Sequence, residues 1–305
     1  MSRIDELVAY PIKSLDGVAV DRAELGASGA LRGDRTYAFV EAGVDPHEAS
    51  VGGGGGYVNG KSEPAIHGLR ASYELAGAAD ATPTAVTLSR PERAGDVAVD
   101  AAERTFALPD DREAIEAWVG EYLGYDVDLV REPDGGFPDD REAPGPTVVS
   151  QATLETFASW FDGVADATEA RRRLRPNVVF GDCPAFWEDR LVADRDSRVR
   201  FSVGGTTVLG VNPCQRCVVP SRDPETGAEL SGFRETFIEK RQETMPAWSG
   251  GDRFDHAFRV MVNTVVPKPS WGNVVSVDDP VRIEETVAVD EATDGGEAAD
   301  GDDPS

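Results

Sequence analysis

Two of the three cysteines form a Cys-x-x-Cys pair, Cys214 and Cys217, in the stretch Asn212-Pro-Cys-Gln-Arg-Cys217. Arg216 stands directly before the second cysteine. A cysteine attacks electrophiles or binds soft metals as its thiolate, and a neighbouring guanidinium favours that form. The sequence therefore predicts that any chemistry of this chain is centred on Cys217.

A tight turn is predicted shortly after this cysteine, in the stretch Asp223-Pro-Glu-Thr-Gly227. Proline fixes φ near the start of such a turn, and glycine is free to take a positive φ at its end. We expect residues 217–220 to form a strand that runs into this turn. Such a strand would hold Cys217 rigidly.

Basic residues gather in a few short motifs of a chain whose formal net charge is −26. Each motif alone is typical of a surface lysine, a structural ion pair or a solvated helix face. Together with Cys217 they predict a pocket for a compact anion, with lysine as a point charge and arginine as a bidentate fork on phosphate. The motifs are Tyr10-Pro-Ile-Lys-Ser14, Leu31-Arg-Gly-Asp-Arg35, Arg171-Arg-Arg-Leu-Arg-Pro-Asn177 and Arg216.

Acidic residues dominate the composition, with 56 Asp and Glu against 30 Lys and Arg. Excess surface carboxylate and few lysines are typical of halophilic acidic proteins from a salt-loaded cytoplasm. Self-repulsion of this size should destabilise the fold at low salt and be screened at molar salt. The charge also argues against nucleic acid as a partner, because phosphate backbones require a basic surface.

The length of 305 residues allows one large domain or two coupled ones, and the 40% hydrophobic content indicates a globular protein. The sequence has no run of about 18 apolar residues, and its first residues lack the apolar stretch of a secretory signal. We therefore expect a cytoplasmic protein that does not span a membrane.

Three cysteines in a cytoplasmic chain do not make a disulfide framework. A structural zinc site normally needs four ligands at metal-finger spacing, and a second Cys pair is missing here. A zinc site that also uses Cys183 and His256 stays open as an alternative.

The first part of the chain is predicted to be rich in strands, because short apolar or alternating runs are separated by Gly, Pro, Asp and Ser. These runs are 4–10, 18–25, 36–40, 69–75, 85–88 and 127–130. A helix is expected over 110–124, with an apolar stripe that includes Ile115 and Trp118 and a stop at Gly124. The glycine run 52–56 has no helix after it, so we expect a flexible loop rather than a phosphate-binding one.

The second part continues with strands and a few helices. Helices are expected after Ser150, over 168–174 and over 233–243, and strands over 178–180, 198–203, 207–211, 217–220, 258–266 and 281–287. The fold class is therefore mainly β, of the α+β kind. We expect an N-terminal domain over 1–131, a linker over 132–146, a second domain over 147–287 and a disordered acidic tail over 288–305.

The ordered set of motifs resembles the MOSC family, a domain also found at the C-terminal end of molybdenum cofactor sulfurases. The resemblance covers roughly residues 3–287, and the N-terminal part is similar to the β-barrel domain that precedes MOSC. It implies an N-terminal β-barrel-like domain packed on a MOSC β-barrel domain with a few peripheral helices, interwoven at the cofactor site. The motifs are Tyr10-Pro-Ile-Lys-Ser14, Gly33-Asp-Arg-Thr-Tyr37, Val148-Val-Ser150, Arg175-Pro-Asn-Val-Val179 and the stretch from Cys214 to Gly227.

The pattern is most similar to the mitochondrial amidoxime-reducing components and their bacterial relatives, which reduce N-hydroxylated compounds at a pterin-bound molybdenum. The resemblance implies that Cys217 is the catalytic thiolate ligand of molybdenum, which suits a soft metal. It further implies a set of residues that hold the pterin and its phosphate or flank the metal. This set is Lys13, Ser14, Arg35, Ser150, Arg175, Asn177, Gln215 and Arg216.

Some features depart from the family pattern. Gln215 stands where the animal proteins have Ser, which puts a local polar contact in doubt but not the metal ligand. No iron–sulfur cysteine cluster is appended, so electrons would come from an external ferredoxin- or cytochrome-type protein. No pyridoxal-phosphate aminotransferase part precedes the MOSC part, so a self-contained desulfurase is not expected.

Three functions remain open from the sequence. The first is a molybdenum-dependent oxidoreductase that reduces small N-hydroxylated substrates. The second is a carrier of sulfur or molybdenum cofactor that uses a Cys217 persulfide. The third is a structural module in which Cys214 and Cys217 have no chemical role.

Overall fold

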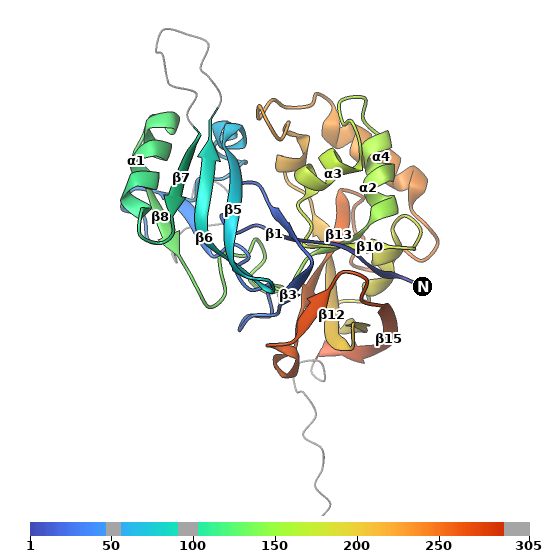
Figure 1. The fold of residues 1–305 in the computed structure, drawn as a ribbon. Helices are drawn as coiled ribbons and strands as arrows, with labels where there is room; N and C mark the ends of the chain where they lie inside the picture. Colours follow the sequence, from blue (N-terminus) through green and yellow to red (C-terminus); the bar gives the residue numbers. More distant parts are fainter. Residues whose placement is uncertain (47–55, 91–102, 290–305) are drawn as a thin grey trace, which may run out of the picture.

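The computed structural model describes residues 1–46, 56–90 and 103–289 (Figure 1). Two features predicted above lie mostly outside these ranges, namely the glycine loop at 52–56 and the acidic tail beyond residue 289. No helix in the described ranges is long and apolar enough to cross a membrane.

The largest element is a mixed sheet in which strands from both ends of the chain lie side by side. Strands β9 and β10 are parallel, and the other neighbouring pairs are antiparallel. In spatial order the strands are β15 (Val281–Ala288), β11 (Ser197–Val203), β12 (Thr206–Gln215), β13 (Arg259–Val265), β9 (Val148–Ser150), β10 (Val178–Gly181), β1 (Arg3–Ala9) and β2 (Val18–Val20).

Smaller sheets make up much of the rest. Figure 1 shows β5, β6 and β7 grouped with helix α1 on one side of the molecule, apart from helices α2, α3 and α4. One sheet joins β5 (Arg70–Gly77), β6 (Asp80–Ser89) and β7 (Arg104–Ala107), and two pairs join β4 (Tyr37–Glu41) to β8 (Val127–Arg131) and β3 (Arg22–Glu24) to β14 (Val274–Ser276).

The described ranges contain four α-helices, each close to a position where a helix was predicted. Helix α1 (Arg112–Leu123) buries Ile115 and Trp118 and ends at Gly124, whose φ of 85° is the left-handed conformation that glycine adopts freely. The others are α2 (Gln151–Ser159), α3 (Ala167–Leu174) and α4 (Phe233–Thr244), with short 3-10 helices η1 (Pro64–Gly68), η2 (Trp187–Leu191), η3 (Val219–Ser221) and η4 (Lys268–Ser270).

The hydrophobic core falls into separate clusters. One cluster packs α1 against β4, β6 and β8, with Phe39 and Phe106 fully buried. A second lies on the large sheet, and a third is an aromatic cluster of α2, α3 and α4 centred on Phe157, whose ring is 5.3 Å from that of Phe161 and 5.9 Å from that of Phe237. The predicted mainly β fold with a few peripheral helices is confirmed.

The N-terminal strand belongs to the sheet of the second half. Strand β1 pairs with β10, and the hydroxyl of Tyr10 donates to the carbonyl of Pro176 at 3.1 Å. The motif that follows β1 is thereby placed beside the end of α3. The domain limits 1–131, 132–146 and 147–287 stay a prediction, although residues 132–147 fold onto both halves through hydrogen bonds from Glu132 to Thr36 and from Gly145 to Thr264.

The strand predicted over 217–220 is wrong. Strand β12 continues to Gln215, beyond the predicted end at Val211, and the chain then enters η3. Pro220 has no N–H for a ladder, and the Ser221 hydroxyl donates to the Val218 carbonyl at 2.7 Å, which favours a local turn. Strands β7, β9 and β14 were not predicted.

Candidate functional site

A cavity of about 830 Å³ lies where the two halves of the chain meet. Its walls come from the segment after β1, the segment before β9, the end of α3 and the loop that follows β12. The structure brings most of the predicted site residues to this cavity. They are Lys13, Ser14, Arg35, Arg175, Gln215, Arg216 and Cys217, whereas Ser150 and Asn177 do not line it.

The charge of the cavity is opposite to that of the chain. Fourteen Lys and Arg residues line it against three Asp residues, in a chain of net charge −26. Nearly half of the 30 basic residues of the sequence are therefore gathered at one site. Clustered cations repel one another unless an anion lies among them, so the lining is suited to an anionic ligand.

Lys13 and Arg35 form the inner cationic group. The Lys13 ammonium donates to the carbonyl of Phe137 at 2.9 Å and pairs with Asp139, while Arg35 pairs with Asp34 and lies 3.5 Å from Asp139. Burial lowers the pKa of Lys13. Burial acts to raise the pKa of Asp139, but the charges of Lys13 and Arg35 outweigh it and hold this pKa well below its usual range. The exposed part of Asp139 faces the cavity, so its carboxylate marks where an anion is stabilised.

Arg175 is a cation of the cavity that has no carboxylate partner within 4.0 Å among the described residues. Its guanidinium lies 4.2 Å from the ring centre of Tyr10, which Arg35 also approaches at 5.3 Å. Arg175 is in the left-handed conformation, with φ of 59°, where its N–H caps α3 by donating to Arg171 at 2.7 Å. Burial and then the nearby charge of Arg35 lower its pKa, and one guanidinium nitrogen is buried without a partner.

Cys217 lies half-buried in the loop between β12 and η3. The backbone N–H of Arg216 donates to Phe258 at 3.1 Å, which fixes the loop to the start of β13. The Arg216 guanidinium donates to the Leu174 carbonyl at 3.1 Å and contacts the Met261 sulfur at 3.7 Å. Arg216 therefore joins the Cys217 loop to the end of α3 as well as lining the cavity.

The other two cysteines have different surroundings. Cys214 is buried, its Sγ donates to the Asn263 side-chain oxygen at 2.6 Å, and burial raises its pKa to about 12, so it is a neutral thiol. Cys183 packs on the core of the large sheet, apart from the aromatic core that holds Cys214. Within the part of the chain that the structure describes, no three His, Cys, Asp or Glu residues gather in a way that could hold a metal, which gives the zinc alternative no support.

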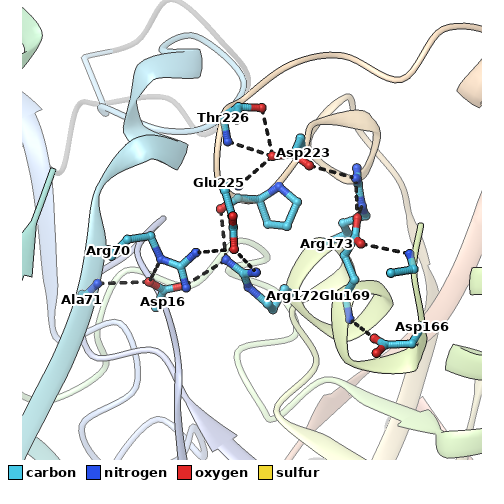
Figure 2. Close-up of polar contacts among 12 residues, drawn as sticks. Asp16, Arg70, Ala71, Asp166, Glu169, Arg172, Arg173, Asp223, Glu225 and Thr226 are labelled. Atoms are coloured by element: carbon cyan, nitrogen blue, oxygen red, sulfur yellow. Dashed lines mark hydrogen bonds and ion pairs between the residues drawn. The ribbon is translucent and has the colours of Figure 1, made fainter. Parts of the chain in front are cut away.

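The turn after Cys217 is pinned by charged residues from both halves (Figure 2). Asp223 accepts from the backbone N–H of Glu225 at 3.0 Å and of Thr226 at 2.8 Å, as the predicted turn requires. Glu225 lies between Arg70 of β5, at 3.4 Å, and Arg172 of α3, at 3.1 Å, and Asp16 pairs with the same two arginines.

Arg173 also contacts the segment that follows Cys217. Its guanidinium donates to the carbonyls of Pro220 at 3.3 Å and Arg222 at 2.7 Å, and it pairs with Glu169 at 2.6 Å. The side chain is only 2% exposed. The basic run predicted to bind an anion thus supplies, in Arg172 and Arg173, the supports of the Cys217 segment.

Ser150 and Asn177 have positions that differ from the prediction of direct cofactor contact. Ser150 is fully buried and caps α2, its hydroxyl accepting from the Thr153 N–H at 3.1 Å. Asn177 donates to the Val8 carbonyl at 3.0 Å and to Asp34 at 3.1 Å, so it holds the carboxylate that pairs with Arg35. Both contacts hold the surrounding elements in place.

Several lining residues were not predicted from the sequence. Asp139 was hidden among 56 acidic residues, His67 stands in no recognised motif, and Arg222 lies within the stretch from Cys214 to Gly227 but was not singled out there. Tyr10 was named only as the first residue of a motif, yet the guanidinium groups of Arg35 and Arg175 both lie near its ring. A usable signal for Tyr10 was its place directly after a strand and before the Pro-Ile-Lys bend.

The fold and the site define a mainly β protein with a large cation-rich cavity and a cysteine in its wall. Residues 1–126 match the family described as the MOSC N-terminal beta barrel domain. This part of the chain is therefore similar to the N-terminal domain of MOSC proteins, which supports the resemblance that the motifs indicate, and the MOSC family is associated with molybdenum cofactor-binding proteins. No curated protein was found to match the chain.

Proposed function

We propose that this protein binds a molybdenum-pterin cofactor in the cavity, ligates its metal through Cys217 and reduces small N-hydroxylated compounds. The observation that carries the proposal is the meeting of fourteen cations and the Cys217 thiol at one cavity of a chain with net charge −26. A phosphorylated polar heterocycle needs such cations, and a soft metal is suited to the thiolate.

The residues present fit such a group. Among the described residues, Arg175 and Arg216 each have a buried guanidinium nitrogen without a hydrogen-bond partner, and both line the cavity. A buried donor without a partner is costly, so native structures satisfy such groups with protein, water or ligand. An anionic ligand among these arginines would supply acceptors that the protein does not provide.

The roles follow from the positions. Lys13, Arg35 and Arg175 would bind the phosphate, with Ser14 as a hydroxyl partner of the pterin and Gln215 and Arg216 beside the metal. Ser150 and Asn177 would act by position, through α2 and through the Asp34–Arg35 pair.

When bound, the cofactor would supply a two-electron redox centre for cleavage of the N–O bond. The reaction takes up two electrons and two protons, releases water and leaves an N–H bond. We propose that the electrons come from an external ferredoxin- or cytochrome-type protein and that the protein works in the cytoplasm. The part of this chain is to orient the substrate and to hold the metal ligand on a loop fixed at both ends.

A sulfur or cofactor carrier is the second candidate. The observation in its favour is that a second cysteine, Cys214, lines the same cavity as Cys217. Cys214, once it has given up its proton, could take the outer sulfur of a Cys217 persulfide by exchange, which leaves Cys217 as the thiolate.

Turnover separates the two candidates. Cofactor-loaded protein, supplied with a chemical reductant, should convert an N-hydroxylated amidine to the amidine. The Cys217→Ser variant should not catalyse this conversion. Protein that transfers labelled sulfur from Cys217 and shows no N–O cleavage would instead support the carrier.

A further inference from the structure

Arg222 is a cation of the cavity that the proposed cofactor site leaves unexplained. It lies between η3 and the Asp223 turn, and its guanidinium donates to the carbonyl of Gly227 at 3.2 Å. Its Nε is buried without a partner, and among the described residues no carboxylate lies within 4.0 Å of its guanidinium.

The neighbouring arginines differ in this respect. Arg70, Arg172 and Arg173 are each balanced by carboxylates, as the dashed lines of Figure 2 show. The sequence has 56 Asp and Glu residues that could pair with an arginine. An arginine without a carboxylate partner, beside arginines that have one, is therefore suited to an anionic ligand.

His67 of η1 lies near Arg222, because Gly227, whose carbonyl accepts from Arg222, lies against Pro64 of the same short helix. Burial and the charge of Arg175 lower the pKa of His67, a hydrogen bond with the backbone of Gly60 raises it, and the charges of Arg222 and Arg173 lower it again. The resulting pKa is about 4, so the imidazole is neutral at pH 7. Its Nε2 is buried without a hydrogen-bond partner, and the residue lines the cavity. A neutral imidazole can donate to an anion without adding to the local positive charge.

Two cationic groups can therefore be distinguished in the cavity. Lys13 and Arg35 surround Asp139, whereas Arg222 and Arg173 act on His67. The charge of Arg175 acts on both Lys13 and His67, so Arg175 is assigned to neither group alone. The proposed cofactor has one phosphate, which the proposal assigns to Lys13, Arg35 and Arg175.

We infer that the cavity binds a second anionic group at Arg222 and His67, and that this group is a phosphate of the substrate, as in an N-hydroxylated nucleotide. The assignment of this group to the substrate rests on the proposed function, whereas the second anion site itself does not depend on it. A guanidinium and an imidazole donor together match the oxygen geometry of a phosphate.

The site itself is tested with inorganic phosphate by equilibrium dialysis. Full-length cofactor-free protein should bind two phosphates and cofactor-loaded protein one. Arg222→Gln should remove the phosphate that remains in the loaded protein, with a loss of affinity of about tenfold or more, and Arg22→Gln, an exposed arginine outside the cavity, should not. Loaded protein that binds no phosphate, or binds it equally well as Arg222→Gln, would overturn the inference.

The substrate class is tested with a matched pair, an N-hydroxylated nucleoside and its 5′-phosphate. The phosphate form should have a KM lower by about tenfold or more, and Arg222→Gln should abolish this difference between the two compounds. Equal KM values in the unmodified protein would overturn the assignment to substrate. Absence of turnover with both compounds, together with an intact second phosphate site, would refute the reductase and leave the anion site standing.

A cofactor with a longer, nucleotide-bearing tail could also bring a second phosphate. Phosphate analysis of the extracted cofactor separates the two sources. One phosphate per molybdenum supports the substrate assignment, and two would assign the Arg222 site to the cofactor.

Discussion

At the scale of single residues, the cavity combines balanced and unbalanced charges. Asp139 occupies the position between Lys13 and Arg35, so a phosphate that binds there must compete with it or share it. In the part of the chain that the structure describes, neither Arg175 nor Arg222 has a carboxylate within 4.0 Å. The site is therefore partly held in shape by the chain's own carboxylate and partly left for a ligand.

The neutral state of His67 gives a pH dependence of stability. Its pKa is lowered to about 4 from 6.5, so the unfolded chain takes up a proton before the folded one does. The contribution to stability is complete above about pH 6.5 and is lost as the pH falls toward 4. We expect the unmodified protein to lose about 2 kcal/mol more than His67→Gln between pH 7 and pH 5.

Urea unfolding at a fixed, high salt concentration measures this difference. The two proteins share every other titrating group, so their difference isolates His67. Parallel pH profiles for the two proteins would show that His67 is not held neutral by the fold.

Only some of the residues predicted to bind the cofactor line the cavity, for definable reasons. Lys13, Arg35 and Arg175 stand out in the sequence as cations near the end of a strand or helix in a chain with many carboxylates, and all three line it. Ser150 and Asn177 do not line it, because a motif does not tell whether a polar side chain faces a ligand or the backbone of its neighbours. Only the hydrogen bonds of the folded chain decide this.

At the scale of elements, helix α3 is the support of the Cys217 segment. Arg173 reaches three carbonyls, of Gly163, Pro220 and Arg222, in addition to Glu169. The strand expected over 217–220 was wrong because β-branched residues favour a strand, whereas the Pro220 ring and the Ser221 hydroxyl favour a turn. Helix α1 was predicted well because the spacing of its apolar residues and the stop at Gly124 indicate the same helix.

Arg173→Met should destabilise the fold by about 3–5 kcal/mol, because it leaves buried carbonyls and the carboxylate of Glu169 without their partner. The matched change Arg172→Met, on a side chain that is 24% exposed, should cost at most about 1 kcal/mol. Thermal unfolding of both variants checks this, and similar losses in the two would contradict the structural role assigned to Arg173.

At the scale of the whole molecule, charge is distributed unevenly. The chain carries a net charge of −26, yet its cavity is lined by fourteen cations and three carboxylates. Strand β1 pairs with β10 in the sheet of the second half, which places the motif after β1 beside that half. The site therefore needs both halves of the chain. Composition alone predicted the acidic surface, but the gathering of cations depends on long-range pairing that local patterns do not specify.

The acidic surface should make the fold dependent on salt. At molar salt the screening length is about 3 Å, and at 0.1 M it is about 10 Å, so dilution restores repulsion between surface carboxylates. We expect the melting temperature to fall steadily as KCl is diluted below molar concentration. A melting temperature that does not change with salt would contradict this expectation.

The most direct test of the central claim is the molybdenum and pterin content of the protein, purified at high salt from a host that makes molybdenum cofactor. We predict close to one molybdenum and one pterin per chain, with molybdenum lost in Cys217→Ser and retained in Cys183→Ser, whose thiol lies on another core. Protein without molybdenum, or Cys217→Ser with its full molybdenum content, would contradict the account.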